Sequence, residues 1–402
     1  MHRRWVDGFN VTEQQKDEDG AAEEGEEGEE GEEKLLYTLH VGAKGFEGCH
    51  RAHLLDALVK IIPEGTVEFG KRIDAVEEIV GGKVRMRFVD GSSAEADALI
   101  GCDGIKSRVR ELLFGASNPA SYPHYTNRIA FRGLIPMPAA IAAIGEYKAK
   151  RQHMHIGPNQ HMLHFPVAGQ TLMNFVAFLP DPNDWPDDTK MVAPAKREEV
   201  VEAFKSWGPT CQAITRLLPD DLDKWAIFDS YDHPAPFYAK DKICLAGDAA
   251  HAAAPHHGAG AGIGIEDALC LSTVLEDAMA ACQKGEVGLD QAIKMAFQTF
   301  EEVRHERSQW LVQSSRRICD VYEFMDAETG TDVEKQLAEI KWRSHKIWFF
   351  DIEGMVMESK EGFAKMVEDQ RKKAAQLVGE DGRLDRALFW QRALTEIESV
   401  GA

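Results

Sequence analysis

Alternating hydrophobic and polar positions predict β-strands in two stretches of the chain. The first stretch has turn signals at Gly81-Gly82 and Asp90-Gly91, which are typical of an antiparallel meander with strands at 66–69, 75–80, 84–89 and 93–99. The second stretch, residues 121–235, has few helical patterns and many aromatic residues, and its expected strands are 128–135, 153–157, 161–167, 172–179 and 222–229. A strand is also expected at 34–41, and residues 3–8 are compatible with a strand that runs into a turn.

Apolar residues at helical spacing predict several helices. One covers the region from 49 to about 62, and its apolar stripe is Leu54, Leu55, Leu58, Ile61 and Ile62. Another begins at Ile263 and runs to about Ala281, with Ile265, Leu269, Leu275 and Met279 on one side. Residues 193–218 are also expected to be helical. Residues 289–325 form one long predicted helix, and its charged residues are interpreted as a solvated face: Arg304, His305, Glu306, Arg307, Arg316 and Arg317.

The segment 242–267 joins three different patterns. Residues 242–246 are an apolar run of strand type that ends at Gly247 and Asp248, and residues 249–264 are small, with four glycines between 258 and 264. The helix that begins at Ile263 follows directly. Because glycine lets a backbone approach a ligand and a helix N-terminus attracts negative charge, this order predicts a site for an anionic group. A glycine-rich turn alone is equally compatible with an ordinary tight turn.

The full string is a much more specific signal than a glycine-rich turn alone. It runs Gly-Asp-Ala-Ala-His, six further residues, Gly-Ala-Gly-Ala-Gly and then Glu-Asp-Ala. It closely resembles the second FAD motif of the group A flavoprotein aromatic hydroxylases, the salicylate hydroxylase-like family. The resemblance implies that Asp248 accepts hydrogen bonds from the ribityl hydroxyls of FAD and that Pro255 lies beside the reaction edge of the flavin. The FAD-binding residues that it implies in this segment are Gly247, Asp248, Pro255, Gly258, Gly260, Ala261, Gly262 and Ile263.

Two earlier motifs are similar to further parts of the same family. Arg51 follows His50 at the start of a predicted helix, and the resemblance implies that its side chain reaches the cofactor; the alternative is a surface arginine. Asp103-Gly104, followed by Ser107-Arg108 after an apolar strand, resembles the family's Asp-Gly motif near the FAD pyrophosphate, which also serves nicotinamide binding. We therefore expect Arg51, Asp103, Gly104 and Arg108 to be cofactor-binding residues.

Composition narrows the class of protein. The net charge is −21, and residues 1–33 contribute 13 acidic and 3 basic side chains, so the rest of the chain is only mildly acidic and nucleic acid is not an expected partner. No apolar run reaches the ~18 residues of a membrane span. Seven cysteines without a Cys-x-x-Cys pair argue against a disulfide framework or zinc site, and a cytoplasmic location is expected. No carboxylate or cysteine completes a ligand set for the histidines at 153, 155, 161 and 164, so no metal is expected.

The predicted fold class is α/β (α+β), with a Rossmann-like FAD-binding domain at 34–120 and 236–330. A mostly β substrate domain is inserted at 121–235, and a helical region follows at 331–402. Residues 1–33 are expected to be disordered because a Glu-Glu-Gly tract cannot bury apolar surface. The family opens with a strand and Gly-x-Gly-x-x-Gly, and no such unit follows a strand near this N-terminus. Two explanations for the missing unit stay open. Either the sequence is incomplete at its N-terminus, or this is the real protein and it binds FAD poorly.

The resemblance implies an FAD-dependent monooxygenase that uses NADH or NADPH and dioxygen to hydroxylate a small aromatic acid or phenol through a flavin C4a-hydroperoxide. A phenol must lose its proton to become a better nucleophile, and His50, His256 and His257 have suitable pKa values for that step. His50, Pro255 and His256 are the candidate catalytic residues. Two alternatives stay open: a non-catalytic remnant that acts by protein interaction, and an epoxidase of the same fold. The protein is expected to be a monomer or homodimer.

Overall fold

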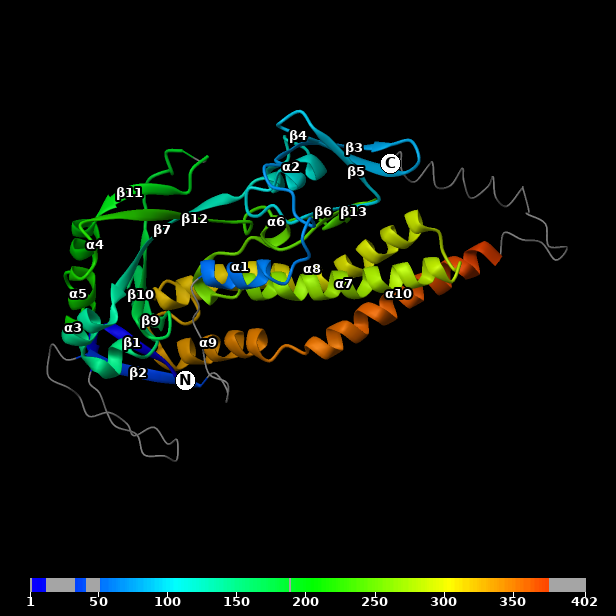
Figure 1. The fold of residues 1–402 in the computed structure, drawn as a ribbon. Helices are drawn as coiled ribbons and strands as arrows, with labels where there is room; N and C mark the ends of the chain where they lie inside the picture. Colours follow the sequence, from blue (N-terminus) through cyan, green and yellow to red (C-terminus); the bar gives the residue numbers. More distant parts are fainter. Residues whose placement is uncertain (1, 12–32, 41–50, 188, 376–402) are drawn as a thin grey trace.

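The computed structural model describes residues 2–11, 33–40, 51–187 and 189–375 and contains two packed units (Figure 1). The first unit is built on an eight-stranded sheet in the order β11-β12-β7-β10-β9-β8-β1-β2. Its strands are β1 His2–Val11, β2 Glu33–His40, β7 His124–Pro136, β8 His153–Gly157, β9 Gln160–Val167, β10 Leu172–Pro180, β11 Val192–Lys196 and β12 Asp221–Asp229. Neighbouring strands are antiparallel except β1 and β8, which are parallel.

Three helices cover one face of this sheet: α3 Met137–Ala149, α4 Arg197–Ala203 and α5 Pro209–Arg216. Phe131, Met162 and Phe175 point from the strands into the core beneath these helices, where they meet Phe204 and Ile214. Alternate residues of the same strands face the other way, because successive side chains of a strand point to opposite faces. That second face packs against the flavin-motif segment and the long helix α8 Leu289–Tyr322.

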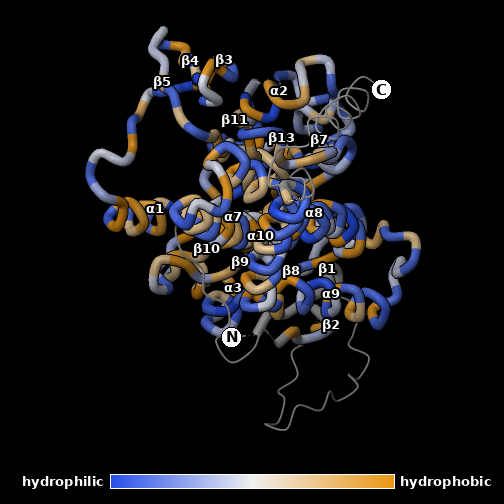
Figure 2. The backbone as a smooth tube through the Cα atoms, turned by 90° about the vertical axis from the view of Figure 1, so that its right-hand side faces the viewer, coloured by the Kyte–Doolittle hydropathy of each residue, from blue (hydrophilic) through white to orange (hydrophobic). Residues whose placement is uncertain are grey.

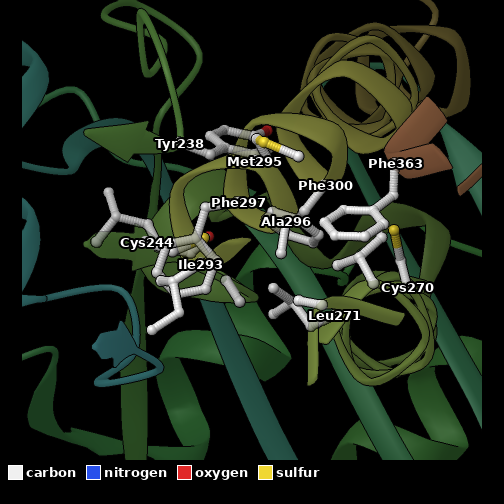
Figure 3. Packing of buried hydrophobic residues seen from close by; sticks show 14 of the residues in the cluster. Tyr238, Cys244, Cys270, Leu271, Ile293, Met295, Ala296, Phe297, Phe300 and Phe363 are labelled. Atoms are coloured by element: carbon white, nitrogen blue, oxygen red, sulfur yellow. The ribbon is translucent and has the colours of Figure 1, made fainter. Parts of the chain in front are cut away.

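The second unit surrounds a short sheet of β13 Ala239–Lys240, β14 Ile243–Leu245 and β6 Leu99–Gly101. Around it lie α2 Arg108–Phe114, α6 Asp248–His251, α7 Gly260–Gln283, α8 and α10 Ile352–Ala375, while α9 Val333–Trp348 packs toward β2. Figure 3 shows how Phe297 and Phe300 of α8 fill the space between α7 and Phe363 of α10. Helix α10 is therefore part of the core of this unit.

A separate meander of β3 Ile73–Ile79, β4 Lys83–Phe88 and β5 Ser93–Ala96 confirms the predicted turns at Gly81-Gly82 and Asp90-Gly91. The predicted strand at 66–69 is wrong, since these residues form turns and loops. The expected helix at 193–218 is also only partly right. It begins as β11 and then divides into α4 and α5, because Gly208 and Pro209 start a new helix.

Two predicted apolar stripes do not face a core. None of the residues of α1 Arg51–Val59 is buried, and Figure 2 shows this helix with its hydrophobic positions at the edge of the molecule. In α7, Ile265 is 68% exposed and Met279 is 50% exposed. The core instead receives Ile263, Cys270, Leu271 and Val274 from the side of α7 that contacts α8 and α10.

The strand pairings also change the expected domain boundaries. Strands β1 and β2 belong to the large sheet, so His2–Val11 is not disordered as expected, and Glu33–His40 extends the substrate-side sheet rather than the FAD-binding unit. Residues 12–32 and 376–402 lie outside the described part of the chain. The mixed α/β class is confirmed.

Candidate active site

The structure brings two of the predicted FAD motifs to one edge of the short sheet. Strands β6 and β14 are parallel, with Gly101 opposite Leu245, and the Ala246 amide donates to the Gly101 carbonyl at 3.0 Å. The segment that contains Asp103 and Gly104 therefore leaves the sheet beside the segment that contains Gly247 and Asp248. Ligands of open α/β sheets bind at this position, outside the carboxyl ends of parallel strands.

The glycine segment leaves open backbone where a cofactor can approach. Gly247 and Gly258 have φ angles of +61° and +65°, and among the described residues neither has an atom within 4 Å of where a Cβ would lie; Gly262 has the same open space. In the part of the chain that the structure describes, no side chain caps the N-terminus of α7, so its first N–H groups are available to an anionic group. Ala261 and Gly262 are exposed in this first turn. The open glycines and the uncapped helix fit the flavin and the phosphates of FAD.

A buried ionic network holds this segment in place. The Asp267 carboxylate accepts three hydrogen bonds: from the Gly247 amide at 2.9 Å, from His251 Nε2 at 2.6 Å and from Arg304 Nε at 2.9 Å. Arg304 also reaches Glu266 at 2.8 Å. Burial alone would raise the pKa of Asp267, but the His251 hydrogen bond and the Arg304 charge outweigh it and lower this pKa.

The solvated-face interpretation of α8 is therefore wrong for Arg304 and for Arg307. Arg304 is 0% exposed, and Arg307 donates to both oxygens of Glu266 at 2.7 and 2.8 Å. Their carboxylate partners lie about 40 positions earlier in the chain, on α7. Side-chain charge alone indicates exposure, and only the packing of α7 on α8 reveals that these charges are paired.

Sequence reasoning also missed Arg110. Its guanidinium donates to the carbonyls of Ala249 and Ala250 at 3.0 and 2.9 Å, and to the Ala120 carbonyl at 2.5 Å. Burial lowers its pKa to about 10, so it remains charged at neutral pH. Arg110 thus ties α2 to the turn that follows β14.

The cofactor residues expected from the other motifs have structural contacts of their own. Asp103 caps α2, because its carboxylate accepts from Ser107 Oγ at 2.5 Å and from the Arg108 and Val109 amides at 2.7 and 3.1 Å. The Arg108 guanidinium donates to the Asp74 carbonyl at 3.0 Å and pairs with Glu111 at 2.6 Å. Arg51 is exposed at the first residue of α1. Their cofactor roles stay predictions, as does that of the exposed Asp248.

A cavity of about 680 Å³ lies between the large sheet, the 3₁₀ helix η2 Pro255–His257 and α8. Its walls are Thr126, Asn127, Arg128, Pro180, Asp181, Pro182, Tyr231, His256, Arg316, Arg317, Cys319 and Asp320. Of the three candidate catalytic residues, the structure places His256 at this cavity and Pro255 next to it, whereas His50 lies outside the described residues. His257 points elsewhere and bonds Ser314 Oγ at 2.8 Å.

The ring of His256 packs against residues that are distant from it in the sequence. Its ring lies 5.3 Å from the ring of His161 and 4.7 Å from that of Phe178. His161 Nδ1 lies 2.9 Å from Glu323 Oε1, and Arg128 pairs with the other oxygen of Glu323 at 2.6 Å. His161 and Glu323 are 162 positions apart, so no local pattern could have paired them.

Ligand atoms of His161, His256 and Cys319 lie within 4.8 Å of one another, which is the spacing that a metal ion would need. Burial raises the pKa of the Cys319 thiol well above its usual value, so the surroundings keep this sulfur protonated, the form that does not bind a metal. The expectation of no metal stays a prediction.

Comparison with known proteins agrees with this geometry. Residues 53–315 match the FAD binding domain family. The chain is 48% identical over 366 residues to the FAD-dependent monooxygenase pigN of Monascus ruber, covering 91% of this chain and 80% of that protein. It is 45% identical over 370 residues to the salicylate hydroxylase asL1 of Sarocladium schorii, covering 90% and 74%. A solved substrate complex of salicylate hydroxylase matches with a TM-score of 0.69 and 30% identity, covering 77% of this chain and 75% of that one.

The fold and the site thus define a flavin-binding oxidoreductase. More narrowly, the chain belongs to the family of FAD-dependent monooxygenases, and FAD is its cofactor. This confirms the predicted enzyme class and the resemblance on which it rested. In the described part of the chain, no helix is long and apolar enough to cross a membrane.

Proposed function

We propose that the protein hydroxylates a phenolic aromatic substrate, with dioxygen as the oxygen donor and NADH or NADPH as the electron donor. The observation that supports this proposal is the position of the cavity, which lies against His256, one residue after the proline expected beside the flavin. A cavity of about 680 Å³ is within the range of roughly 300–1,000 Å³ that ligand pockets occupy.

FAD, when bound, supplies the redox chemistry, because it takes hydride from the nicotinamide and then activates dioxygen. The chain supplies the position of the cofactor. In this proposal, the first N–H groups of α7 and the open backbone at Gly258 and Gly262 hold anionic parts of FAD, and Asp248 accepts from its hydroxyl groups. The Asp267 network keeps the Gly247 turn in the orientation that this requires.

His256 is the residue that we assign to the substrate proton. Burial and the neighbouring His161 lower the pKa of His256 well below its ordinary value, so the ring is neutral at pH 7 and can accept a hydrogen bond from the phenol, while the same shift makes it a weaker base. Removing the phenol proton makes the ring carbon a stronger nucleophile, which is the change that hydroxylation needs. The buried pair of His161 and Glu323 behind His256 keeps its ring from turning away from the cavity.

The test is His256→Gln, which retains a polar side chain of similar length. With FAD-loaded protein and a panel of phenols, we expect kcat/KM to fall roughly 10²-fold or more, as for the loss of a general base. The loss should be much smaller for a nitrophenol that is already ionised at the assay pH. His257→Gln is the matched control, because its ring bonds Ser314 instead. An equal loss for ionised and neutral phenols would contradict the role of His256.

A further inference from the structure

The charged residues in the walls of the cavity limit which substrates it can bind. Three guanidinium groups line it, those of Arg128, Arg316 and Arg317. A free arginine in such a cavity would be the natural partner of a substrate carboxylate, because the planar guanidinium binds a carboxylate through two parallel hydrogen bonds. Binding of a substrate carboxylate therefore depends on an arginine that is not already paired with a carboxylate of the protein.

Each guanidinium is already paired with a carboxylate of the protein. Arg128 pairs with Glu323 at 2.6 Å, and Glu323 is 0% exposed. Arg316 binds both oxygens of the fully buried Asp229, at 2.5 and 3.0 Å, and also reaches Asp232 at 3.1 Å.

The third arginine is held from outside the cavity. Arg317 donates to Asp326 at 3.1 Å and to Glu328 at 2.5 Å. The cavity walls themselves also contain Asp181 and Asp320. Carboxylates thus outnumber the guanidinium groups in and directly behind the walls.

The paired arginines and the surplus of carboxylates disfavour the binding of an aromatic carboxylate. To bind Arg128 or Arg316 it would have to share a guanidinium that already pairs with a buried carboxylate, so two negative charges would lie close together in a low-dielectric site. To bind without an arginine it would face a surplus of like charge.

A phenol, by contrast, finds suitable neutral groups. Thr126 Oγ1 is buried without a hydrogen-bond partner among the described residues, and the ring of His256 lies at the same cavity. The volume of about 680 Å³ also exceeds what a single substituted ring fills.

We propose that the cavity selects an uncharged phenol larger than one ring and discriminates against aromatic carboxylates such as salicylate. This inference rests on the proposed function, since it assigns the substrate class of the same cavity. Arg128, Arg316 and Arg317 shape the walls and stay bound to their protein partners during turnover. Glu323 is the specificity-determining residue, because it neutralises Arg128 and also bonds His161.

The test compares two probes that differ in one charge, 1-hydroxy-2-naphthoate and 1-hydroxy-2-naphthamide. Each is titrated into FAD-loaded protein, and Kd is read from the change in flavin absorbance, followed by substrate-stimulated NAD(P)H oxidation. We expect the amide to bind at least tenfold more tightly than the carboxylate. Glu323→Gln should free Arg128 and improve binding of the carboxylate at least tenfold, with little change for the amide.

Glu328→Gln is the matched control, because Arg317 keeps Asp326 in that variant and the preference for the amide should be unchanged. If Glu323→Gln does not fold, Asp229→Asn tests the same idea at Arg316, and the wild-type comparison stands by itself. Tighter binding of the carboxylate by wild-type protein, with turnover, would overturn the inference and leave the proposed function intact. No binding of either probe by fully FAD-loaded protein would refute the proposed function and this inference with it.

Discussion

Arg304→Met offers the most direct test of the network that holds the flavin segment. Methionine has a similar length and no charge, so the variant keeps most of the packing and removes the cation from Asp267 and Glu266. The Arg304 side chain is 0% exposed, and it is bonded to Asp267 at 2.9 Å and to Glu266 at 2.8 Å. Removing one partner of a buried ion pair costs about 3–5 kcal/mol, a large part of a typical stability of about 5–15 kcal/mol.

The same substitution should weaken FAD binding. Asp267 accepts from the Gly247 amide at 2.9 Å, and without Arg304 its pKa should rise, so the carboxylate is held less firmly in its charged form. The bond between the Gly247 amide and Asp267 is a hydrogen bond to a charged group, worth about 1.5–3 kcal/mol. Its complete loss would raise the FAD Kd by roughly 10- to 150-fold, which is the upper limit for this variant.

Urea denaturation of the FAD-free protein and titration with FAD measure the two effects separately. Arg304→Met combined with Asp267→Asn should be more stable than Arg304→Met alone, because no unpaired buried charge remains. Arg85→Met, which removes an exposed arginine that pairs with Glu95 on the meander, should change stability little. A free energy of unfolding within about 1 kcal/mol of wild type for Arg304→Met, or strictly additive effects in the double variant, would refute the reasoning.

Three further predictions concern the cofactor and the sheet. Asp248→Ala should raise the FAD Kd roughly tenfold or more, measured by flavin fluorescence, and an unchanged Kd would remove Asp248 from the site. Gly258→Val should lower both FAD content and melting temperature, because its φ of +65° strains a β-branched residue; a normal melting temperature would contradict this. Burial lowers the pKa values of His155 and His164 well below 6.5, so below that pH the unfolded chain binds protons that the folded protein excludes. Stability should therefore fall as the pH drops below 6.5, by about 1.4 kcal/mol per pH unit for each histidine, and His164→Gln should flatten this slope in urea titrations.

Local patterns were sufficient for most of the secondary structure. The strand at 153–157 agrees with β8 at both ends, and 172–179 differs from β10 by one residue. β10 is rich in apolar residues, and turn signals follow both strands, so local sequence is enough to predict where they end. The prediction at 66–69 was wrong because alternation over four residues is weak evidence unless a neighbouring strand offers hydrogen bonds.

Patterns of hydrophobicity were less successful in telling which side of a helix is buried. The predicted stripe of α7 contains exposed residues, such as Ile265 and Met279, and the core side contains Ile263, Leu271 and Val274 together with the buried Asp267. Packing against α8 and α10 decides which side of α7 is buried, and a buried aspartate is tolerated there because Arg304 pairs with it. A hydropathy pattern contains neither of these facts.

The sequence by itself indicated the class of this protein, because the flavin motif is contiguous: strand, glycine turn and helix start lie within residues 242–267, and this string resembles a motif of the FAD-dependent monooxygenase family. Only the tertiary structure decided what surrounds the cofactor segment. Arg304 meets Asp267 across 37 positions, Arg110 reaches Ala250 across 140, and Glu323 meets His161 across 162. Such contacts depend on how the helices pack on the sheets, and charged residues read in order along a chain show neither their burial nor their partners.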